Sequence, residues 1–380
     1  MIPGMSPRVI SSHLLFCRIL ALVISTFSSS WVCGPTGNVE QVQREDAYIT
    51  AEVQTHHFRG AVLVGMGGRV VFEKGYGAAD DEWDARNTPT TKFRIASLTK
   101  QFTAACILLL QERGQLNVND RASKYLPSLP RMWQAMTIHQ LLTHTSGVPN
   151  PDYKGHQYAT IQRTGATPEE LVAFVADQPL EFKPGTGWNY TNTGYIVLGM
   201  IIEKTSGKSY AEFLKNNIFE PLIMSNSGYD TETDILKKRA SGYQLRNGEL
   251  ANANFIDMST PFSAGGIYST VEDLYRWNEA LAQNGKLLSA ASLKEMFTEY
   301  PEAEHEGQHY GYGVVISRQK FGKLLYYHGG GTEGFSSSIQ RYPQDQLCII
   351  VLSNLDSVKP WEMGDHLASD IFNLPMPVLH

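Results

Sequence analysis

The sequence predicts an α+β fold, in which one antiparallel β-sheet is built from both ends of the chain and flanked by helices. Two groups of strand-like segments, one near each end, and a long helical stretch between them lead to this prediction. The 380 residues are 42% apolar and 18% charged, which suffices for a substantial core and does not resemble a disordered chain. A helical region inserted between the two halves of a sheet creates a junction, where ligand sites are common.

The strand-like segments at both ends are separated by turn residues. After a helix expected at 42–57, two apolar runs flank Gly67 and Gly68, which is typical of a β-hairpin. Near the other end, four short segments predict an antiparallel meander, and a final helix is expected at 361–372. These four segments are YGYGVVIS, KLLYYHGGG, GFSSSIQRYP and QLCIIVLSN.

Helix start and stop signals are frequent in the region from roughly 115 to 300. Thr167, Pro168 and Glu170 combine an N-cap, a proline at the first helical position and the partner of a capping box. Ser269 or Thr270 can cap the helix VEDLYRWNEALAQ. Glycines stand where helix C-caps are expected, at positions 114, 207 and 285. We therefore expect a mostly helical region inserted between the sheet-forming ends.

The N-terminal segment has the pattern of a secretory leader. Arg8 precedes an apolar stretch whose uninterrupted part, 19–27, is too short for a membrane-spanning helix of about 20 residues. Small polar residues follow it and suit a cleavage site near 28–32. We expect residues 1–33 to be removed, which leaves a secreted or periplasmic domain, 34–380, without a stable membrane span. A lipid anchor at Cys33 is disfavoured, because the preceding SSWV does not match the small-residue pattern of a lipoprotein site.

Charge and cysteine content exclude several classes of partner and cofactor. The net charge of −6 and the lack of a long Lys/Arg cluster argue against nucleic-acid binding, which requires many phosphate contacts. Cys106 and Cys348 lie in apolar runs, where a free cysteine is most often a small core residue. His139 and His144 lack further ligands at a recognised metal spacing, so helix-surface or capping roles are favoured. We predict no metal, no cofactor and no disulfide framework.

The first pattern with catalytic potential is Ser97-x-x-Lys100, at the start of the apolar, glycine-terminated helix expected at 98–114. Residues three apart on a helix share a face, so the lysine amine can reach the serine hydroxyl, which needs a neighbouring base to become a good nucleophile. The structural alternative is an N-cap serine followed by a solvent-exposed lysine. The same spacing recurs at Ser317 and Lys320, in what we predict to be a polar hairpin turn.

Two further patterns accompany the first. Tyr190 and Asn192, in NYTNTGY, precede an amphipathic helix, and they can be an aromatic turn residue and an N-cap or a proton relay and a carbonyl-binding amide. His328 begins HGGG after a predicted strand, and these glycines permit close approach of a backbone or a ligand. The backbone amides of Ser97 and Gly331 could then form an oxyanion hole. The alternative is a glycine-rich hairpin turn.

Taken in this order, the three patterns resemble the motifs of the penicillin-recognising serine hydrolases. The sequence is most similar to the class C β-lactamase-related branch, which contains β-lactamases, D-Ala-D-Ala carboxypeptidases, D-aminopeptidases and esterases. The resemblance extends over about 59–354 and implies a β-lactamase/transpeptidase-like fold. It rests further on the stretches TIHQLLTHTSGV, PGTGWNYTNTGYIVLGMIIEKTSGKSYAEFL, SAGGIYSTVEDLYRW and HGGGTEGFSSSIQRYP.

The resemblance implies a role for each residue of the patterns. Ser97 would attack the substrate carbonyl, Lys100 would be the neighbouring base, Tyr190 would transfer a proton to the leaving group and Asn192 would orient the substrate. Which of Lys100 and Tyr190 removes the serine proton stays open. A lysine must be neutral to act as a base, so burial or a nearby cation must lower its pKa from the usual value of about 10.4.

His328 is a departure from the family pattern, whose third motif usually begins with lysine. With Gly329 and Gly330, it would lie in the substrate-binding strand, but a permanent cation that anchors a substrate carboxylate is replaced by a group with an ordinary pKa of about 6.5. This change weakens the case for β-lactams and favours esters, amides or peptides. It also led us to expect that carboxylate-bearing substrates lose affinity as pH rises from about 6 to 8.

We therefore expect a serine hydrolase that acts through an acyl-enzyme on an ester, amide or peptide bond of a small-molecule or peptide substrate. The first alternative is a true β-lactamase or a D-Ala-D-Ala carboxypeptidase. The second is a penicillin-binding receptor that deacylates slowly. Retention of all the motif elements argues against a scaffold that only binds, because a binder needs no Ser-Lys pair.

Overall fold

The structure is a computed structural model that describes residues 39–151, 155–283 and 285–376. The predicted leader and Cys33 lie outside these residues. Within the described ranges, no helix has both the length and the apolar character needed to cross a membrane.

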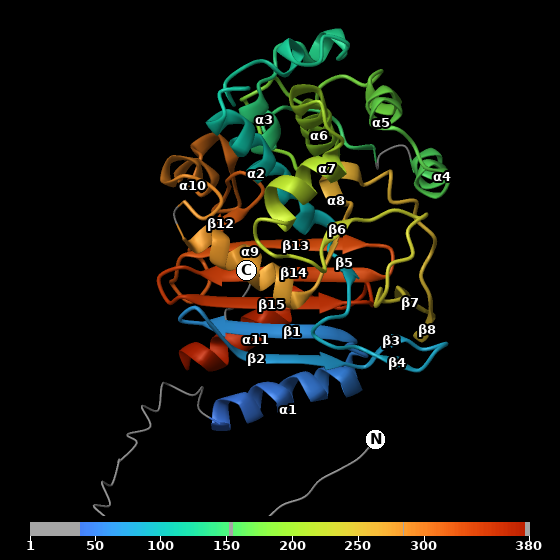
Figure 1. Cartoon of the computed structure of the whole chain (residues 1–380), viewed down its shortest axis with the longest axis vertical. Helices are drawn as coiled ribbons and strands as arrows, with labels where there is room; N and C mark the ends of the chain where they lie inside the picture. Colours follow the sequence, from blue (N-terminus) through green and yellow to red (C-terminus); the bar gives the residue numbers. More distant parts are fainter. Residues whose placement is uncertain (1–38, 152–154, 284, 377–380) are drawn as a thin grey trace, which may run out of the picture. The chain divides into compact units, whose positions relative to one another are not determined.

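An eight-stranded antiparallel sheet joins the two ends of the chain (Figure 1). Its order, β10-β11-β12-β13-β14-β15-β1-β2, places the N-terminal hairpin next to the last strand, with Gly60 opposite Ser353. Gly67 and Gly68 have the positive φ that the predicted hairpin turn requires. The α+β architecture predicted from the sequence is therefore confirmed. The strands are β1 (Gly60–Met66), β2 (Arg69–Tyr76), β10 (Glu304–His305), β11 (Gln308–Tyr310), β12 (Val315–Ser317), β13 (Leu325–Thr332), β14 (Phe335–Tyr342) and β15 (Leu347–Ser353).

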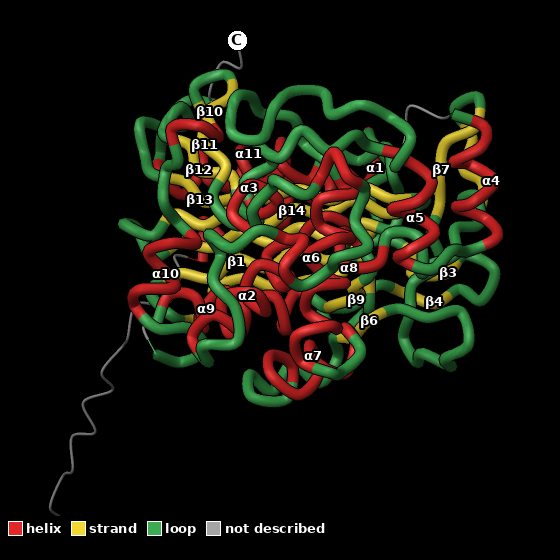
Figure 2. Tube along the Cα trace, turned by 90° about the horizontal axis from the view of Figure 1, so that it is seen from above, coloured by secondary structure: helices red, strands yellow, loops and turns green. Residues whose placement is uncertain are grey.

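Helices cover both faces of this sheet. The terminal helices α1 (Val39–Thr55) and α11 (Pro360–Phe372) lie on one side, and α2 (Thr99–Glu112) and α9 (Val271–Ala282) lie on the other (Figure 2). Because successive strand residues point to opposite faces, β1 contributes to two cores. Val62 and Val64 pack in the core beneath α1 and α11, while Ala61 and Leu63 belong to the larger core that contains α2 and α9.

The region between the sheet-forming segments contains most of the helices, but it also contains short strands. These strands form a three-stranded sheet, β5-β9-β6, and two hairpins, β3-β4 and β7-β8. Each has only two to four residues, too few to produce a periodic signal in the sequence. Their bounds are β3 (Ala78–Asp80), β4 (Ala85–Arg86), β5 (Phe93–Arg94), β6 (Gly228–Tyr229), β7 (Tyr243–Arg246), β8 (Glu249–Asn252) and β9 (Ile267–Ser269). The remaining helices are α3 (Ile138–Leu142), α4 (His156–Thr164), α5 (Pro168–Val175), α6 (Asn192–Ser206), α7 (Tyr210–Leu214), α8 (Phe262–Gly265) and α10 (Ala290–Met296).

The predicted capping signals set several of these helix ends. Thr167 and Glu170 form the expected capping box at the start of α5. Thr270, and not Ser269, caps α9, since its side chain accepts a hydrogen bond from the Asp273 amide. Gly207 ends α6 in the left-handed conformation that glycine adopts without strain.

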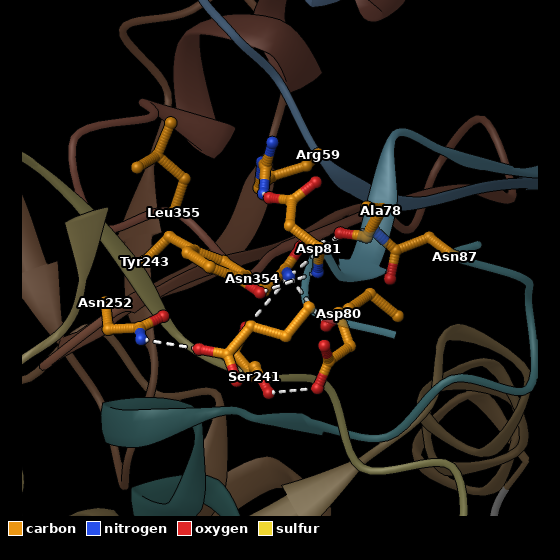
Figure 3. Close-up of polar contacts among 12 residues, drawn as sticks. Arg59, Ala78, Asp80, Asp81, Asn87, Ser241, Tyr243, Asn252, Asn354 and Leu355 are labelled. Atoms are coloured by element: carbon orange, nitrogen blue, oxygen red, sulfur yellow. Dashed lines mark hydrogen bonds and ion pairs between the residues drawn. The ribbon is translucent and has the colours of Figure 1, made fainter. Parts of the chain in front are cut away.

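Asn354 ties the end of β15 to three other segments (Figure 3). Its side-chain Nδ2 donates to the backbone carbonyl oxygens of Ala78 and Ser241 at 3.1 and 2.9 Å. Its side-chain Oδ1 accepts a hydrogen bond from Asn87 Nδ2 at 3.1 Å. Asn354 is fully buried, so these bonds offset the loss of its hydration. The network fixes the point where the chain leaves the sheet, two residues before Asp356.

Candidate active site

Ser97 lies in a short helical turn, Ala96–Leu98, immediately before α2. This turn is held between two sheets, because the Ile95 amide donates to the Ile267 carbonyl at 3.0 Å and the Ile95 carbonyl accepts from the Ser337 hydroxyl at 2.8 Å. Ala96 has a φ of +47°, a conformation that costs a non-glycine residue about 1–2 kcal/mol. The surrounding bonds therefore hold Ser97 in a strained turn at the N-terminal end of a buried helix.

Lys100 is completely buried and reaches three neutral oxygen atoms. Its Nζ lies 3.1 Å from Ser97 Oγ, as the Ser-x-x-Lys spacing predicted, and 2.8 Å from Asn192 Oδ1. The third oxygen, the Ala264 carbonyl at 2.9 Å, comes from α8 and carries no sequence signal. The structure thus brings Ser97, Lys100 and Asn192 into direct hydrogen-bond contact.

Tyr190 lies beside this trio. Its ring centroid is 4.7 Å from Lys100 Nζ, and the neighbouring Ser97 side chain acts on the pKa of its hydroxyl. Burial raises the pKa of Tyr190 well above its ordinary value, an effect that Ser97 only partly opposes. Tyr190 is therefore a protonated phenol at neutral pH and is placed to donate a hydrogen bond.

His328 lies on β13 and is buried with both ring nitrogens bonded. Nδ1 donates to the Gly329 carbonyl at 2.6 Å, which leaves Nε2 to accept from the Tyr310 hydroxyl at 2.8 Å. Burial first, and then the positive charge of Lys100, lower the pKa of His328 to about 4. The ring is thus neutral across pH 6–8, and our expectation that its charge changes over that range is wrong. The depth at which this histidine is buried depends on tertiary packing, which no local pattern in the sequence indicates.

The glycines after His328 allow β13 to approach the serine turn. A Cβ on Gly330 would lie 2.3 Å from the Ile95 carbonyl oxygen and 3.0 Å from the Ser97 amide nitrogen, so a side chain would push the two segments apart. A Cβ on Gly331 would meet no atom within 4 Å, and this residue lines an open pocket together with Ser97. Gly330 therefore allows β13 to approach the serine turn closely, and Gly331 leaves the pocket beside Ser97 open.

His144 lies within the site, contrary to the helix-surface or capping role that we favoured. It is fully buried, with ring centroids 4.3 Å from Tyr190 and 4.5 Å from Tyr310. Its Nδ1 accepts a hydrogen bond from the Thr191 amide at 3.2 Å. Burial, reinforced by the charge of Lys100, lowers its pKa well below the ordinary value, so the ring is neutral. Its position after the short helix α3 gave no sequence signal for this packing. His139, by contrast, bonds Tyr312 and Glu302 outside the trio.

Two pockets flank the serine turn. The first, of about 370 Å³, is lined by Ser97, Asn192 and Gly331 together with Glu333 and Asp356. The second, of about 190 Å³, is lined by Tyr190, His328 and aromatic side chains that include Trp188 and Tyr310. Sequence reasoning identified neither the carboxylates of the first pocket nor the aromatic residues of the second, because they come from separate loops and strands. Among the described residues, no group of three or more His, Cys, Asp or Glu side chains is arranged to hold a metal ion.

Comparison with known proteins identifies the family. The family model described as Beta-lactamase matches residues 46–371. The chain belongs to the β-lactamase family. It is 31% identical to penicillin-binding protein 4* of Bacillus subtilis, over 86% of this chain and 75% of the relative.

Solved structures agree with this assignment. The octameric penicillin-binding protein homologue from Pyrococcus abyssi superposes with a TM-score of 0.77 at 30% identity, over 88% of this chain and 78% of its own. A D-stereospecific amidohydrolase from Streptomyces superposes with a TM-score of 0.70 at 28% identity, over 83% of this chain and 94% of its own. These similarities confirm the family resemblance and the fold, and they support a hydrolase.

Proposed function

We propose that the protein is a serine hydrolase that cleaves an ester, amide or peptide bond through an acyl-enzyme on Ser97. The observation that carries the proposal is the 3.1 Å contact between Ser97 Oγ and the fully buried Lys100 Nζ. A serine hydroxyl is a weak nucleophile unless a base lies within hydrogen-bond reach. The similarity to an amidohydrolase of the same fold supports hydrolysis of acyl bonds.

In the first step, Ser97 Oγ attacks the substrate carbonyl carbon and its proton passes to Lys100 in its uncharged form. Burial stabilises this form relative to a lysine in water, while the charged form, with which it is in equilibrium, is the one that lowers the pKa of His328. The raised pKa of Tyr190 keeps the phenol protonated, which favours Lys100 as the acceptor of the serine proton and Tyr190 as the donor to the leaving group. The bond to the leaving group then breaks, and the leaving group departs with a proton from Tyr190, which regains one from Lys100. The acyl group stays on Ser97.

In the second step, water attacks the acyl-enzyme and gives a proton to the same base. The bond between the acyl carbon and Ser97 Oγ then breaks, the base returns the proton to Ser97, and the acid is released. The amides of Ser97 and Gly331 would stabilise the oxyanion in both steps, a contribution of about 3–4 kcal/mol in other enzymes. Asn192 accepts from Lys100 through Oδ1, which leaves its amide nitrogen to orient the substrate. These roles of Ser97, Lys100, Tyr190, Asn192 and Gly331 are part of the proposal.

A second candidate function is the binding of β-lactams with slow deacylation, which the similarity to penicillin-binding protein 4* favours. The neutral His328 weighs against it, because a β-lactam carboxylate would find no permanent cation on this strand. A β-lactamase would instead hydrolyse the same adduct.

The test follows intact mass and product release with a neutral para-nitrophenyl ester and, separately, with benzylpenicillin. The wild type, Ser97→Ala and the matched control Ser317→Ala would be compared. We expect the wild type and Ser317→Ala to gain the acyl mass and turn over the ester, and Ser97→Ala to do neither. Turnover by Ser97→Ala at the wild-type rate would overturn the proposal. With penicillin, a lasting adduct would identify a slow-deacylating binder, and rapid hydrolysis a β-lactamase.

A further inference from the structure

The two pockets beside Ser97 differ in their chemistry. Among the described residues that line the first pocket there are two carboxylates, Glu333 and Asp356, and no Lys, Arg or His. The second pocket is lined mainly by aromatic rings and histidines. Ser97 lines the first pocket and Tyr190 lines the second, so a substrate whose scissile bond lies at Ser97 can extend into both, and their difference bears on which substrates fit.

The residues on each side indicate which half of the substrate enters which pocket. Ser97, Asn192 and Gly331, which contact the acyl carbonyl in the proposed function, line the first pocket. Tyr190, the proposed proton donor to the leaving group, lines the second pocket and not the first. The acyl half therefore extends into the first pocket, and the leaving group extends into the second.

The carboxylates of the acyl pocket are held in place by their neighbours. Glu333 accepts hydrogen bonds from Thr332 at 2.9 Å and from Gln162 of α4 at 3.4 Å, so it bridges β13 and the opposite wall. Asp356 accepts from the Gly334 amide at 3.3 Å and follows the segment that Asn354 fixes. Their mutual repulsion adds to burial in raising the pKa of Asp356. A cation bound between them would relieve this repulsion.

The described residues that line the leaving-group pocket include no permanently charged cation to recognise an anion. Trp188 and His305 stack at 4.7 Å and form an aromatic wall. Among the described lining residues there is no Lys or Arg, and the one carboxylate, Glu306, would repel a negative charge. His328 is neutral at physiological pH, as shown above. Flat aromatic side chains favour an uncharged, planar group.

We infer that the substrate carries a cationic group in its acyl half, recognised by Glu333 and Asp356, and an uncharged, apolar or aromatic leaving group. This inference rests on the proposed acyl-enzyme at Ser97 and narrows its substrate class. A terminal residue with a free carboxylate does not suit this leaving-group pocket. Carboxypeptidase action on a peptide C-terminus is therefore disfavoured relative to hydrolysis of a cationic acyl ester or amide.

A set of aryl esters tests both halves of the inference. One acyl group is butanoyl ending in trimethylammonium, and its neutral isostere ends in tert-butyl. Each is joined to para-nitrophenol or to its ring-carboxylated analogue, and every rate is divided by that of uncatalysed hydrolysis. The proteins are the wild type, Glu333→Gln, Asp356→Asn, the double variant and Glu52→Gln, which removes a carboxylate from α1, across the sheet from the α2 side.

We expect the wild type to prefer the cationic acyl group about 10-fold or more in kcat/KM, because the two carboxylates attract the trimethylammonium charge electrostatically. This ratio should fall towards one in the double variant, fall partly in each single variant and persist in Glu52→Gln. Raising the salt concentration should reduce the ratio in the wild type, because ions screen the attraction. The ring carboxylate should lower kcat/KM about 10-fold.

Two kinds of failure are separable. If the wild type does not turn over the neutral ester, or if Ser97→Ala matches it, the proposed function fails. If the neutral ester is turned over by Ser97 but the wild-type ratio is near one, or is unchanged in the double variant, the inference fails and the function stands. The wild-type ratio and its salt dependence decide the question even if the double variant does not fold.

Discussion

Two Ser-x-x-Lys segments of this protein share a spacing and differ in everything around it. Ser97 and Lys100 lie in a helical turn that continues into α2, and their side chains meet at 3.1 Å. Ser317 ends β12, and Lys320 lies in the turn before β13, where its Nζ pairs with Asp365 of α11 at 2.5 Å. The predicted hairpin turn is present, but Lys320 is buried, whereas we had associated this spacing with a solvent-exposed lysine.

The difference shows that backbone conformation and the nearby acceptors decide what the pattern does. In the helical segment, residues three apart share a face, and the lysine reaches uncharged oxygens of Ser97, Asn192 and Ala264. In the turn segment, the serine accepts a bond from the Gln319 amide and the lysine is neutralised by a carboxylate. The first lysine is placed to exchange a proton with its serine, and the second serves to join the turn to a helix.

The largest expected difference between the two segments is in turnover. Lys100→Met should lower kcat for the neutral aryl ester about 1,000-fold, because it removes the proposed base. Lys320→Met should leave kcat per folded molecule unchanged. Steady-state kinetics on protein quantified by active-site mass labelling would measure both. A small effect of Lys100→Met would leave Tyr190 as the candidate base.

The second expected difference is in stability, where the substitution of Lys320 should have a larger effect than that of Lys100. Lys320→Met should lower the free energy of unfolding by about 3 kcal/mol, since it leaves Asp365 buried without its ion-pair partner. Lys100→Met should lower it less, by about 1–2 kcal/mol, because the oxygens of Ser97, Asn192 and Ala264 that lose a hydrogen bond are uncharged. Urea unfolding would measure both. The double variant Lys320→Met/Asp365→Leu should recover most of the loss, and failure to do so would argue against the ion pair as the cause.

A third difference is expected in the titration of His328. The charge of Lys100 is the second cause of its low pKa, so Lys100→Met should raise the pKa from about 4, although burial should keep it below the ordinary value. Between the folded pKa and about 6.5, the unfolded chain binds more protons, so folding stability falls as pH decreases through this window. Lys100→Met should narrow the window, and Lys320→Met should not. NMR of the imidazole, assigned with His328→Asn, would report the shift, and an identical pKa in Lys100→Met would contradict it.

The smallest difference concerns the two serines as structural elements. Ser317→Ala removes one acceptor for the Gln319 amide and should cost about 0.5–1 kcal/mol. Ser97→Ala should change the free energy of unfolding by about 0.5 kcal/mol or less. Residues at functional sites are selected for activity and not for stability, so replacing one seldom destabilises the fold. Thermal unfolding of the two variants side by side would measure this difference. A large loss in Ser97→Ala would mean that the serine also supports the strained turn at Ala96.

The sequence predicted the parts of the fold that have local signals. The hairpin around Gly67 and Gly68, the C-terminal meander and the capping box at Thr167 depend on turn and cap chemistry within a few residues, and all are present. Helix starts were less accurate: α1 begins at Val39, three residues before the expected position. The short strands between 78 and 269 were not predicted, because those of the β5-β9-β6 sheet pair across long distances and those of the β3-β4 and β7-β8 hairpins have only two to four residues each.

For the candidate site, residues that belong to linear patterns were identified and residues supplied by packing were not. The structure brings Ser97, Lys100 and Asn192 together as the patterns indicated. The burial of His144 and the carbonyl of Ala264 depend on how α3 and α8 dock, which no short stretch encodes. The low pKa of His328 arises from the same burial. Charge and solvation at a site follow from tertiary packing, even where residue identity follows from sequence.

The pairing of β1 with β15 also has a consequence for the order of assembly during chain growth. Gly60 is synthesised long before its partner, Ser353, which lies 293 residues later in the chain. The turn that holds Ser97 is equally incomplete until β14 delivers Ser337 to the Ile95 carbonyl. Sheets built from such distant segments fold slowly, after most of the chain is available. The turn that carries the proposed nucleophile is therefore assembled late, so we expect Ser97 to be unreactive in a nascent chain until β14 and β15 have docked.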